Sequence, residues 1–381
     1  MPNSPFDEIS RRNFLKTAAT AAGVAAAPLA AASRAAAQVR VPEPPGKKLG
    51  WAVVGLGSLA INQILPAFAK CEKSKVVAFV SGHRDKADKL AARYGVEAAN
   101  IYNYENYDSI KDNPSIDVVY VVLPNSMHAE YTVRALKAGK HVLCEKPMAN
   151  TPAECERMIA AAKTADRKLM IGYRLHYEPY NQALVKLARE TPELGPTQVI
   201  LADAGFNIGD PGQWRLRKAM AGGGSLMDIG IYALQAARYC SGEEPTEVNA
   251  MMWSDPNDVR FKEVEEHITF QLRFPSGILA NCSSSYGGGL NRWRVVKPSA
   301  WAELEPALNY SGLKLRVSRN GAVEERGARV VDHFGTEMDH FSECIQTNAP
   351  PKTPGEEGLR DLKIMMAIYE AARTGRTVKL A

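Results

Sequence analysis

The chain has 381 residues, too many for one typical domain and enough for two domains that each bury a core. With 45% hydrophobic and 23% charged residues, its composition is that of an ordinary soluble protein. The net charge is +5, and the excess basic residues are scattered, with no basic run and no interleaved aromatic residues. The charge pattern therefore gives no reason to predict nucleic-acid binding.

The N-terminus has the features of an export signal. The sequence "SRRNFLK" at residues 10–16 contains two adjacent arginines, and an uncharged stretch of mostly alanine follows over residues 17–32. This stretch is too short and too weakly apolar to anchor in a bilayer, so we predict no stable membrane anchor. An alanine-rich amphipathic helix is the alternative, which Pro28 disfavours because proline interrupts a helix.

A predicted cleavage site gives the end of this signal. Ala35 and Ala37 form an A-x-A cleavage site, which predicts a signal peptide over residues 1–37. The arginine pair is typical of the twin-arginine type, so we expect the twin-arginine (Tat) export machinery as a partner and the periplasm as the destination. Residues 38–48 are rich in proline and predict an extended arm.

From residue 49 the sequence alternates apolar strands with helices. Strands that are apolar throughout are typical of a parallel sheet covered on both faces, so residues 49–172 predict a Rossmann domain with a doubly wound sheet. Residues 173–381 change rhythm: a long helix near residues 222–241 is followed by alternating segments. This pattern predicts a separate α+β domain, with a large and mainly antiparallel open sheet, for substrate binding and oligomerisation.

Six cysteines are spread through the chain without a CxxC pair, mostly inside apparent helices or strands. Because this spacing is unlike a disulfide framework, we predict buried free thiols, and we predict no metal site. The six are Cys71, Cys144, Cys155, Cys240, Cys282 and Cys344.

The sequence "GLGSLA" after the first strand predicts a dinucleotide site. Gly55 allows the tight turn, Gly57 lets the backbone approach a pyrophosphate, and the small Ala60 lets the helix pack closely on the strand. Ser58 and Leu59 belong to the same turn. The motif is weak alone, but here strand, turn and helix occur in the required order.

The end of the second strand indicates which dinucleotide binds. An NAD site usually has a carboxylate there, whereas this chain has Ser81, Gly82, His83 and Arg84. A hydroxyl and a guanidinium suit a 2′-phosphate, so the sequence favours NADP. Under the alternative interpretation, the basic residues after His83 are only the solvated first turn of a helix.

Two further strands end in polar residues at the same sheet edge, where doubly wound sheets bind ligands. "LPNSMHAEY" contributes Leu123, Pro124, Asn125 and His128, and "CEKPMA" contributes Glu145 and Lys146. An ammonium group at this edge could bond a substrate hydroxyl and lower the pKa of a neighbouring acid. The alternative is that Lys146 is an ordinary surface charge.

A second cluster lies in "GGGSLMDIGIY". Asp228 and Tyr232 are four residues apart at the start of the predicted long helix, so they project from one face. A phenol can take a proton from a hydroxyl when a nearby cation favours its ionised form, and a carboxylate can orient the sugar or a lysine. The alternative is that Tyr232 packs in a core and Asp228 caps the helix.

Together with "GYRLHYEPYN" and "WRLRKAMAGGGSLMDIGIY", these motifs resemble the Gfo/Idh/MocA oxidoreductase family from about residue 49 to the C-terminus. Within that family the chain is most similar to the glucose-fructose and aldose-aldose oxidoreductases. The resemblance implies that Lys146 is the family's EKP lysine, followed by a cis peptide at Pro147. It also implies that Tyr232, in place of the more usual histidine, is the acid/base and that Asp228 is its companion.

The resemblance further implies that aromatic residues and arginines in "GYRLHYEPYN" and at the start of "WRLRKAMAGGGSLMDIGIY" line the sugar and nicotinamide pocket. Of these, Tyr173, Arg174, Trp214 and Arg215 are assigned to the cofactor, and Tyr177 joins Lys146, Asp228 and Tyr232 at the substrate. His176 and Arg217 belong to the same segments. The segments "GFNIGDPGQ" and "GGGLNRWRVVKPSAW" are where acceptor specificity is expected, and an aldose is favoured as both donor and acceptor.

The implied activity is a two-step one: an aldose such as glucose loses hydride from C1 to bound NADP and becomes a lactone, and a second sugar takes the hydride and becomes an alditol. An NADP-dependent sugar dehydrogenase that exchanges its cofactor is the first alternative. A non-catalytic sugar-binding protein on the same fold is the second. An open antiparallel sheet also favours a face-to-face homodimer.

Overall fold

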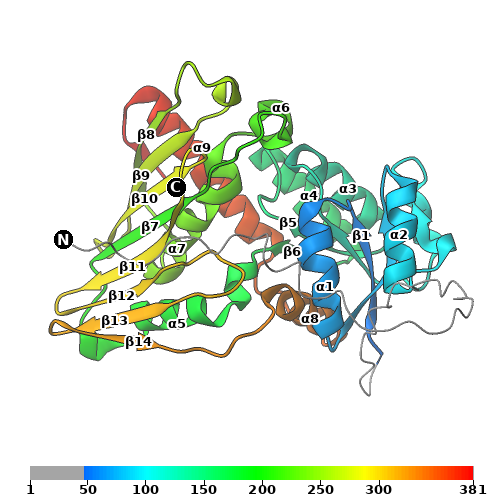
Figure 1. Cartoon of the computed structure of the whole chain (residues 1–381), viewed down its shortest axis with the longest axis horizontal. Helices are drawn as coiled ribbons and strands as arrows, with labels where there is room; N and C mark the ends of the chain where they lie inside the picture. The colour runs from blue at the N-terminus through cyan, green and yellow to red at the C-terminus, as the bar shows by residue number, and fades with distance from the viewer. Residues whose placement is uncertain (1–46, 381) are drawn as a thin grey trace, which may run out of the picture. The chain divides into compact units, whose positions relative to one another are not determined.

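The structure, a computed structural model, describes residues 47–380 (Figure 1). The predicted signal peptide and most of the predicted arm lie outside the described residues. The predicted fold class is confirmed: a parallel sheet occupies the first half of the described chain, and a large, mostly antiparallel sheet occupies the second.

The first sheet has six parallel strands in the order β3-β2-β1-β4-β5-β6. Order reverses at β1, so the carboxyl ends of β1 and β4 border the crevice where such sheets bind ligands. Every residue of the central strand β1 is buried, because helices cover both faces. The strands are β1 Leu49–Val54, β2 Ser74–Val80, β3 Ile101–Tyr102, β4 Val118–Val121, β5 His141–Glu145 and β6 Leu169–Gly172.

The helices of this half begin and end at recognisable signals. Thr151 and Glu154 form a capping box at the start of α4, and Gly95 ends α2 in the left-handed conformation. The helix predicted after β1 is instead a π-helix at Ala60–Ile64, a single α turn (α1, Leu65–Ala67) and a 3-10 turn at Phe68–Lys70. The other helices are α2 Arg84–Tyr94, α3 Asn125–Lys137 and α4 Pro152–Ala165.

The second sheet has nine strands in the order β14-β13-β12-β11-β7-β10-β9-β8-β15, and only β7 and β10 pair in parallel. Buried and less buried residues alternate along β9, which is typical of a sheet with one covered face. The strands are β7 Val199–Gly205, β8 Glu247–Trp253, β9 His267–Arg273, β10 Leu279–Ser285, β11 Leu290–Lys297, β12 Ala300–Leu304, β13 Leu315–Arg319, β14 Ala322–Arg326 and β15 Val378–Lys379.

Three helices cover one face of this sheet (Figure 1): α5 contacts β12, α7 contacts β7 and α9 contacts β8. One hydrophobic core runs from the parallel sheet to the nine-stranded sheet, and α4 packs on α9 between them. The two halves are therefore joined by buried apolar contacts. The helices are α5 Pro179–Arg189, α7 Ile231–Ser241 and α9 Gly355–Thr374.

Three features differ from the sequence-based expectation. The helix predicted over residues 222–241 begins only at a π-helix, Leu226–Gly230, because Gly222 (φ +80°) instead ends the short helix α6, Lys218–Ala221. For the segment "GGGLNRWRVVKPSAW" no secondary structure was predicted, and it contains β11 and the start of β12.

The third is helix α8, His333–Gln346, which had no counterpart in the prediction and packs back on the first sheet. There the Trp51 Nε1–H donates to Ser342 Oγ at 3.2 Å, and the hydroxyls of Ser74 and Ser342 lie 2.8 Å apart.

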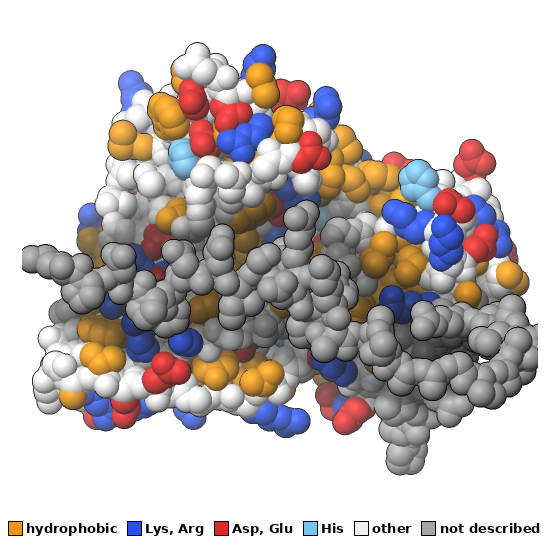
Figure 2. Space-filling view, in the orientation of Figure 1, with side chains coloured by type: hydrophobic (Ala, Val, Ile, Leu, Met, Phe, Trp, Pro, Cys, Tyr) orange, Lys and Arg blue, Asp and Glu red, His pale blue; other side chains and the backbone are white. Residues whose placement is uncertain are grey.

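The cysteine prediction is confirmed, since all six thiols are free and buried. No described helix is long and apolar enough to cross a membrane. On the face seen in Figure 2, acidic and basic side chains are interspersed rather than gathered by sign.

Candidate active site

The first strand ends in a glycine turn that borders a cleft. Gly55 has φ +92°, and a Cβ atom there would lie 2.2 Å from the backbone oxygen of Val122, so only glycine fits. At Gly57 nothing lies within 4 Å of where a Cβ atom would stand. This backbone is open to a ligand at the start of the helical segment of residues 60–70, where N–H groups suit a phosphate.

The cleft has a volume of about 510 Å³ and is bordered by the carboxyl ends of β1, β2, β4 and β5. It brings together most of the predicted site residues. Those that line it are Gly55, Gly57, Ser58, Leu59, Ser81, Gly82, His83, Leu123, Pro124, Asn125, Glu145, Lys146, Trp214, Arg215 and Asp228. Leu56, Lys86, Tyr104, Val122 and Gln213 also line it, and sequence reasoning did not assign them to the site.

The end of the cleft beside β2 is formed by Ser81, Gly82, His83 and Lys86. The Lys86 Nζ donates to the backbone oxygen of Leu56 at 3.3 Å, so the ammonium group lies against the glycine turn. Among the described residues that line this end there is no carboxylate. A glycine turn, a hydroxyl and an ammonium group fit a dinucleotide that carries a phosphate on its ribose.

The prediction for Arg84 is not supported by its position. Its side chain is 61% exposed and pairs with Asp88 at 2.8 Å along α2, and it does not line the cleft. The residues at positions i and i+4 of a helix are neighbours, so the guanidinium group is held on the solvent side of α2. At this end of the cleft the cation that lines it is Lys86 rather than Arg84.

Two residues after β4 hold the loops around the cleft. The Asn125 Nδ2 donates to the backbone oxygen of Ala221 at 2.9 Å. His128 is buried beneath the cleft, with Nδ1 2.9 Å from the Pro147 oxygen and Nε2 2.8 Å from the Leu123 oxygen. Both ring nitrogens of His128 lie within hydrogen-bond distance of backbone oxygens and His128 does not line the cleft, so its position does not support the predicted contact with the cofactor.

Lys146 and Asp228 meet at the inner end of the cleft. The Lys146 Nζ donates to the backbone oxygen of Asp228 and lies 3.4 Å from its Oδ1. Asp228 Oδ2 also lies 2.9 Å from the Arg215 Nε and accepts from the Tyr286 hydroxyl at 3.1 Å. The peptide bond between Lys146 and Pro147 is cis, as the resemblance implied.

Asp228 and Lys146 each favour the charged form of the other. Burial alone would raise the pKa of Asp228, yet Arg215, Lys146 and the Tyr286 hydroxyl together lower it to about 2. Burial would lower the pKa of Lys146, but Tyr232, Asp228 and Glu145 outweigh it and raise that pKa. At neutral pH the site therefore holds a charged ammonium group fixed by an ionised carboxylate.

Tyr232 lies directly behind Lys146. It is 4% exposed, and its ring centroid is 4.8 Å from the Lys146 Nζ and 5.2 Å from the guanidinium carbon of Arg174. Among residues 47–380 its hydroxyl has no hydrogen-bond partner. A phenol between two cations, with a free hydroxyl, is suited to exchange a proton with a substrate hydroxyl.

Besides Arg84 and His128, four predicted residues do not line the cleft: Tyr173, Arg174, Tyr177 and Tyr232. Tyr173 is fully buried beside Asp361 of α9. Tyr177 is buried with its hydroxyl 3.6 Å from the Met170 sulfur and does not line the cleft, so its position does not support the predicted assignment to the substrate. The cause is a 3-10 turn at residues 174–177, which carries the chain away from the cleft and packs against α8.

Arg174, at the start of that turn, stands behind Tyr232 rather than at the cofactor. Its Nη1 lies 3.3 Å from the His333 Nδ1, and the guanidinium group also donates to the backbone oxygen of Leu308 at 2.5 Å. Arg174 thus contacts the site at the ring of Tyr232. Within residues 47–380 no group of three His, Cys, Asp or Glu side chains could hold a metal ion.

Comparison with known proteins identifies the family. The profile described as "Oxidoreductase family, NAD-binding Rossmann fold" matches residues 49–173. The profile "GFO/IDH/MocA C-terminal domain" matches residues 185–296, and "Oxidoreductase family, C-terminal alpha/beta domain" matches 305–380. Residues 8–28 match the twin-arginine translocation signal.

Individual relatives agree with these profiles. The solved aldose-aldose oxidoreductase from Caulobacter crescentus, in complex with glycerol, is 52% identical, with a TM-score of 0.86 over 88% of this chain and 100% of that chain. The D-xylose 1-dehydrogenase [NADP(+)] of Haloarcula marismortui is 31% identical over 87% of this chain and 92% of its own length. A D-xylose 1-dehydrogenase (NADP(+)) of Haloferax volcanii is 27% identical over 87% and 99%. The chain therefore belongs to the Gfo/Idh/MocA family of oxidoreductases.

Proposed function

We propose that the protein is a periplasmic NADP-dependent aldose oxidoreductase that keeps its cofactor bound. It oxidises an aldose such as glucose at C1 to the lactone and then reduces a second sugar, an aldose or fructose, to an alditol in a ping-pong cycle. The observation that carries this proposal is the buried Tyr232, whose hydroxyl has no hydrogen-bond partner among the described residues and whose ring contacts Lys146, a residue that lines the cleft of about 510 Å³. The aldose-aldose oxidoreductase at 52% identity supports the substrate class.

In this proposal Tyr232, Lys146 and Asp228 have different roles in proton transfer. Bound NADP supplies the acceptor for the hydride from C1 and the donor for the hydride that the second sugar takes up. Tyr232 removes the proton of the C1 hydroxyl and later returns a proton to the carbonyl oxygen of the second sugar. Lys146 donates a hydrogen bond to that reacting oxygen, and Asp228 holds the ammonium group in place.

The export signal supports retention of the cofactor. A twin-arginine signal is matched at residues 8–28, and this route moves folded proteins. A protein that folds around NADP before export can bring the nucleotide into a compartment where free NADP is scarce. A second sugar is then the simplest means to regenerate the bound cofactor.

An NADP-dependent dehydrogenase with exchangeable cofactor is the second candidate, favoured by the two D-xylose 1-dehydrogenases. The two candidates differ when purified, diluted protein is mixed with glucose and a second sugar without added nucleotide. Equal amounts of lactone and alditol support our proposal, and turnover that begins only when NADP is added supports the dehydrogenase. Bound NADP that no aldose reduces would contradict both candidates and favour a non-catalytic sugar-binding protein.

The choice of NADP leads to a prediction at Lys86. Replacing Lys86 by alanine removes the ammonium group beside the glycine turn, so we expect affinity for NADPH to fall roughly 10- to 100-fold, as for one lost hydrogen bond to a charged group. Affinity for NADH should be unchanged in titrations of nucleotide-free protein. Arg84→Ala is the matched control and should have a small effect, because Arg84 pairs with Asp88. Equal losses for NADPH and NADH in the Lys86 variant would contradict the assignment.

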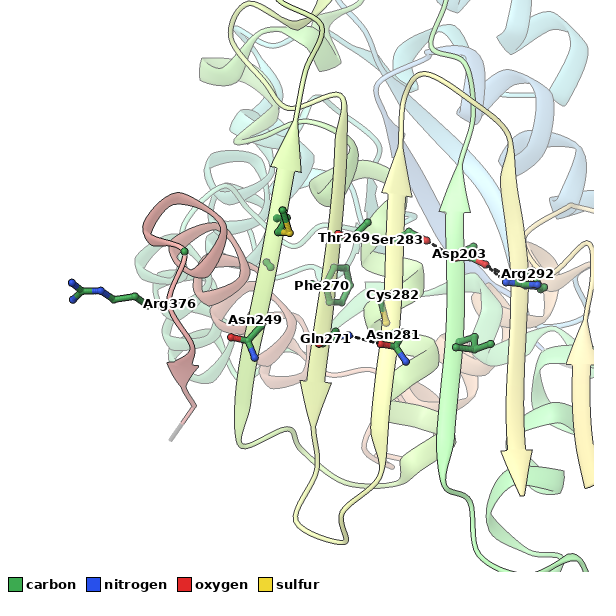
Figure 3. A pocket seen from close by; sticks show the side chains of 14 residues that line it. Asp203, Asn249, Thr269, Phe270, Gln271, Asn281, Cys282, Ser283, Arg292 and Arg376 are labelled. Atoms are coloured by element: carbon green, nitrogen blue, oxygen red, sulfur yellow. Dashed lines mark hydrogen bonds and ion pairs between the residues drawn. The ribbon is translucent and has the colours of Figure 1, made fainter. Parts of the chain in front are cut away.

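We further propose that the open face of the nine-stranded sheet forms a homodimer contact. Figure 3 shows polar side chains bonded in rows across this face: Asp203 pairs with Arg292 at 2.8 Å, and Gln271 donates to Asn281 at 2.8 Å. A shallow cavity of about 660 Å³ lies over the same strands. Met251, which lines this cavity, is 77% exposed and would be covered by such a contact.

An arginine at Leu279 tests this contact. Leu279 is 42% exposed on β10, and it lies on the same face of that strand as Asn281 and Ser283, which face the open side of the sheet. We expect wild-type protein to sediment as a dimer and Leu279→Arg to sediment as a monomer, because a buried unpaired charge opposes association. Val259→Arg, at a 63% exposed residue outside the sheet, is the control. A wild-type monomer, or a dimer that Leu279→Arg leaves intact, would contradict the proposal.

A further inference from the structure

A buried carboxylate holds the start of the helix that carries Asp228 and Tyr232. Glu265, just before β9, is 8% exposed. Its Oε2 accepts the N–H of Gly224 at 2.8 Å, and its Oε1 accepts the N–H of Leu226 at 2.9 Å. The first N–H groups of a helix have no partner within the helix, so a side chain from another element caps this one.

The same residue makes two further contacts with this region. The Tyr369 hydroxyl of α9 donates to Glu265 Oε1 at 2.9 Å. The backbone oxygen of Glu265 accepts the N–H of Ser225 at 3.4 Å. Three consecutive N–H groups, at residues 224–226, are therefore bonded to one residue, which fixes both the position and the direction of the helix start.

The glycines before the helix allow this close approach. A Cβ atom at Gly224 would lie 2.1 Å from the backbone oxygen of Glu265, and one at Gly223 would lie 2.1 Å from the Tyr369 hydroxyl oxygen. Neither residue could carry a side chain without displacing the cap. The N–H of Asp228 bonds in turn to the Gly224 oxygen at 3.4 Å, which joins the capped loop to the residue that holds Lys146.

We propose that Glu265 is a positioning residue for the reaction, one that sets where Asp228 and Tyr232 stand relative to Lys146. The inference rests on the proposed function for the roles of those three residues. Glu265 does not line the cleft, and its hydrogen bonds to the backbone go to the start of this helix. If the cap is lost, the backbone oxygen of Asp228 that accepts from Lys146 is no longer held in place.

The variant Glu265→Gln tests the proposal. An amide would direct its NH₂ group against a backbone N–H, because all three groups around the carboxylate are donors. We expect the rate at which saturating aldose reduces the bound nucleotide to fall about a hundredfold. The nucleotide content and the KM for aldose should stay within about twofold, since no contact at the cleft is removed.

Two other variants keep the experiment interpretable. Glu263→Gln is the matched control: Glu263 also accepts a backbone N–H, from Lys218, but on the surface, and its replacement should leave the rate unchanged. Tyr369→Phe removes one donor and leaves both backbone bonds, so its rate should fall roughly three- to tenfold, and it decides the question if Glu265→Gln does not fold. A normal rate in the folded variants would overturn the proposal.

A crystal structure of Glu265→Gln, or of Tyr369→Phe if the former does not fold, separates this inference from the proposed function. We expect the Lys146 Nζ to lie farther from Asp228 Oδ1 than the 3.4 Å of the wild-type chain. A displaced Asp228 supports positioning by Glu265 even if no aldose reduces the nucleotide of the wild-type protein. An unmoved Asp228 overturns it, whatever the activity.

Discussion

Replacing Tyr232 by phenylalanine is expected to slow the oxidation of an aldose about a thousandfold, within the range that a positioned acid or base contributes. The phenylalanine ring can keep its contacts with Lys146 and Arg174, since both cations lie near the ring of Tyr232. Only the hydroxyl is lost, and it has no partner among the described residues, so the fold should be undisturbed. The measurement is the stopped-flow rate at which aldose reduces the bound nucleotide.

Tyr239→Phe provides the control for this experiment. Tyr239 lies on the same helix α7, and its hydroxyl donates to Glu357 Oε1 at 3.3 Å. Its loss should cost about 1 kcal/mol of unfolding free energy and leave the rate unchanged. A Tyr232→Phe variant that oxidises aldose at the normal rate would show that another group carries the proton.

Replacing Lys146 by methionine should slow both half-reactions by about a hundredfold to a thousandfold, as does the loss of a charged donor aimed at a reacting oxygen. The methionine fills much of the same space but cannot donate to the substrate or place a positive charge near Tyr232. Asp228 should stay ionised, because Arg215 and Tyr286 still contact its carboxylate. Both rates follow from the absorbance of reduced nicotinamide, first with an aldose and then with a second sugar.

Lys140→Met is the matched control for Lys146, at the opposite end of the same strand β5. The Lys140 Nζ donates to the backbone oxygen of Asn113 at 2.9 Å, and burial lowers the pKa of Lys140. Its loss should affect stability but neither half-reaction. If Lys146→Met reduced only the nucleotide content and left the rate per bound nucleotide normal, Lys146 would be a cofactor ligand without a part in proton transfer.

The sequence predicted those parts of the fold and the site that depend on a local pattern of residues. Gly55 and Gly57 follow an apolar strand and precede a helix, and this order alone located the nucleotide turn that the structure contains. Lys146 and Asn125 each follow a strand of the parallel sheet, and the carboxyl ends of parallel strands meet at one edge. A carboxylate at Asp228 was predicted to orient either the sugar or a lysine, and in the structure it lies beside Lys146.

The sequence did not predict contacts made by residues distant in the chain. Tyr286 reaches Asp228 from the end of β10, and Glu265 reaches the helix start from just before β9, and neither lies in a recognisable motif. The sequence did not show that Tyr177 lies away from the cleft, because the direction of a 3-10 turn depends on what packs against it, here a helix α8 that was not predicted. From the sequence, Lys86 belongs to the solvated first turn of a helix. The sequence does not show its contact with the glycine turn, because the two are 30 residues apart.

The measurement that most directly tests the account is the number of turnovers that each bound nucleotide supports. Purified protein, diluted so that free nucleotide is negligible, is given glucose and a second sugar, and lactone and alditol are counted against NADP released by denaturation. We predict many equivalents of both products, in equal amounts, for each NADP. Lactone limited to one equivalent per nucleotide, with no alditol until fresh NADP is added, would contradict a cofactor regenerated in place.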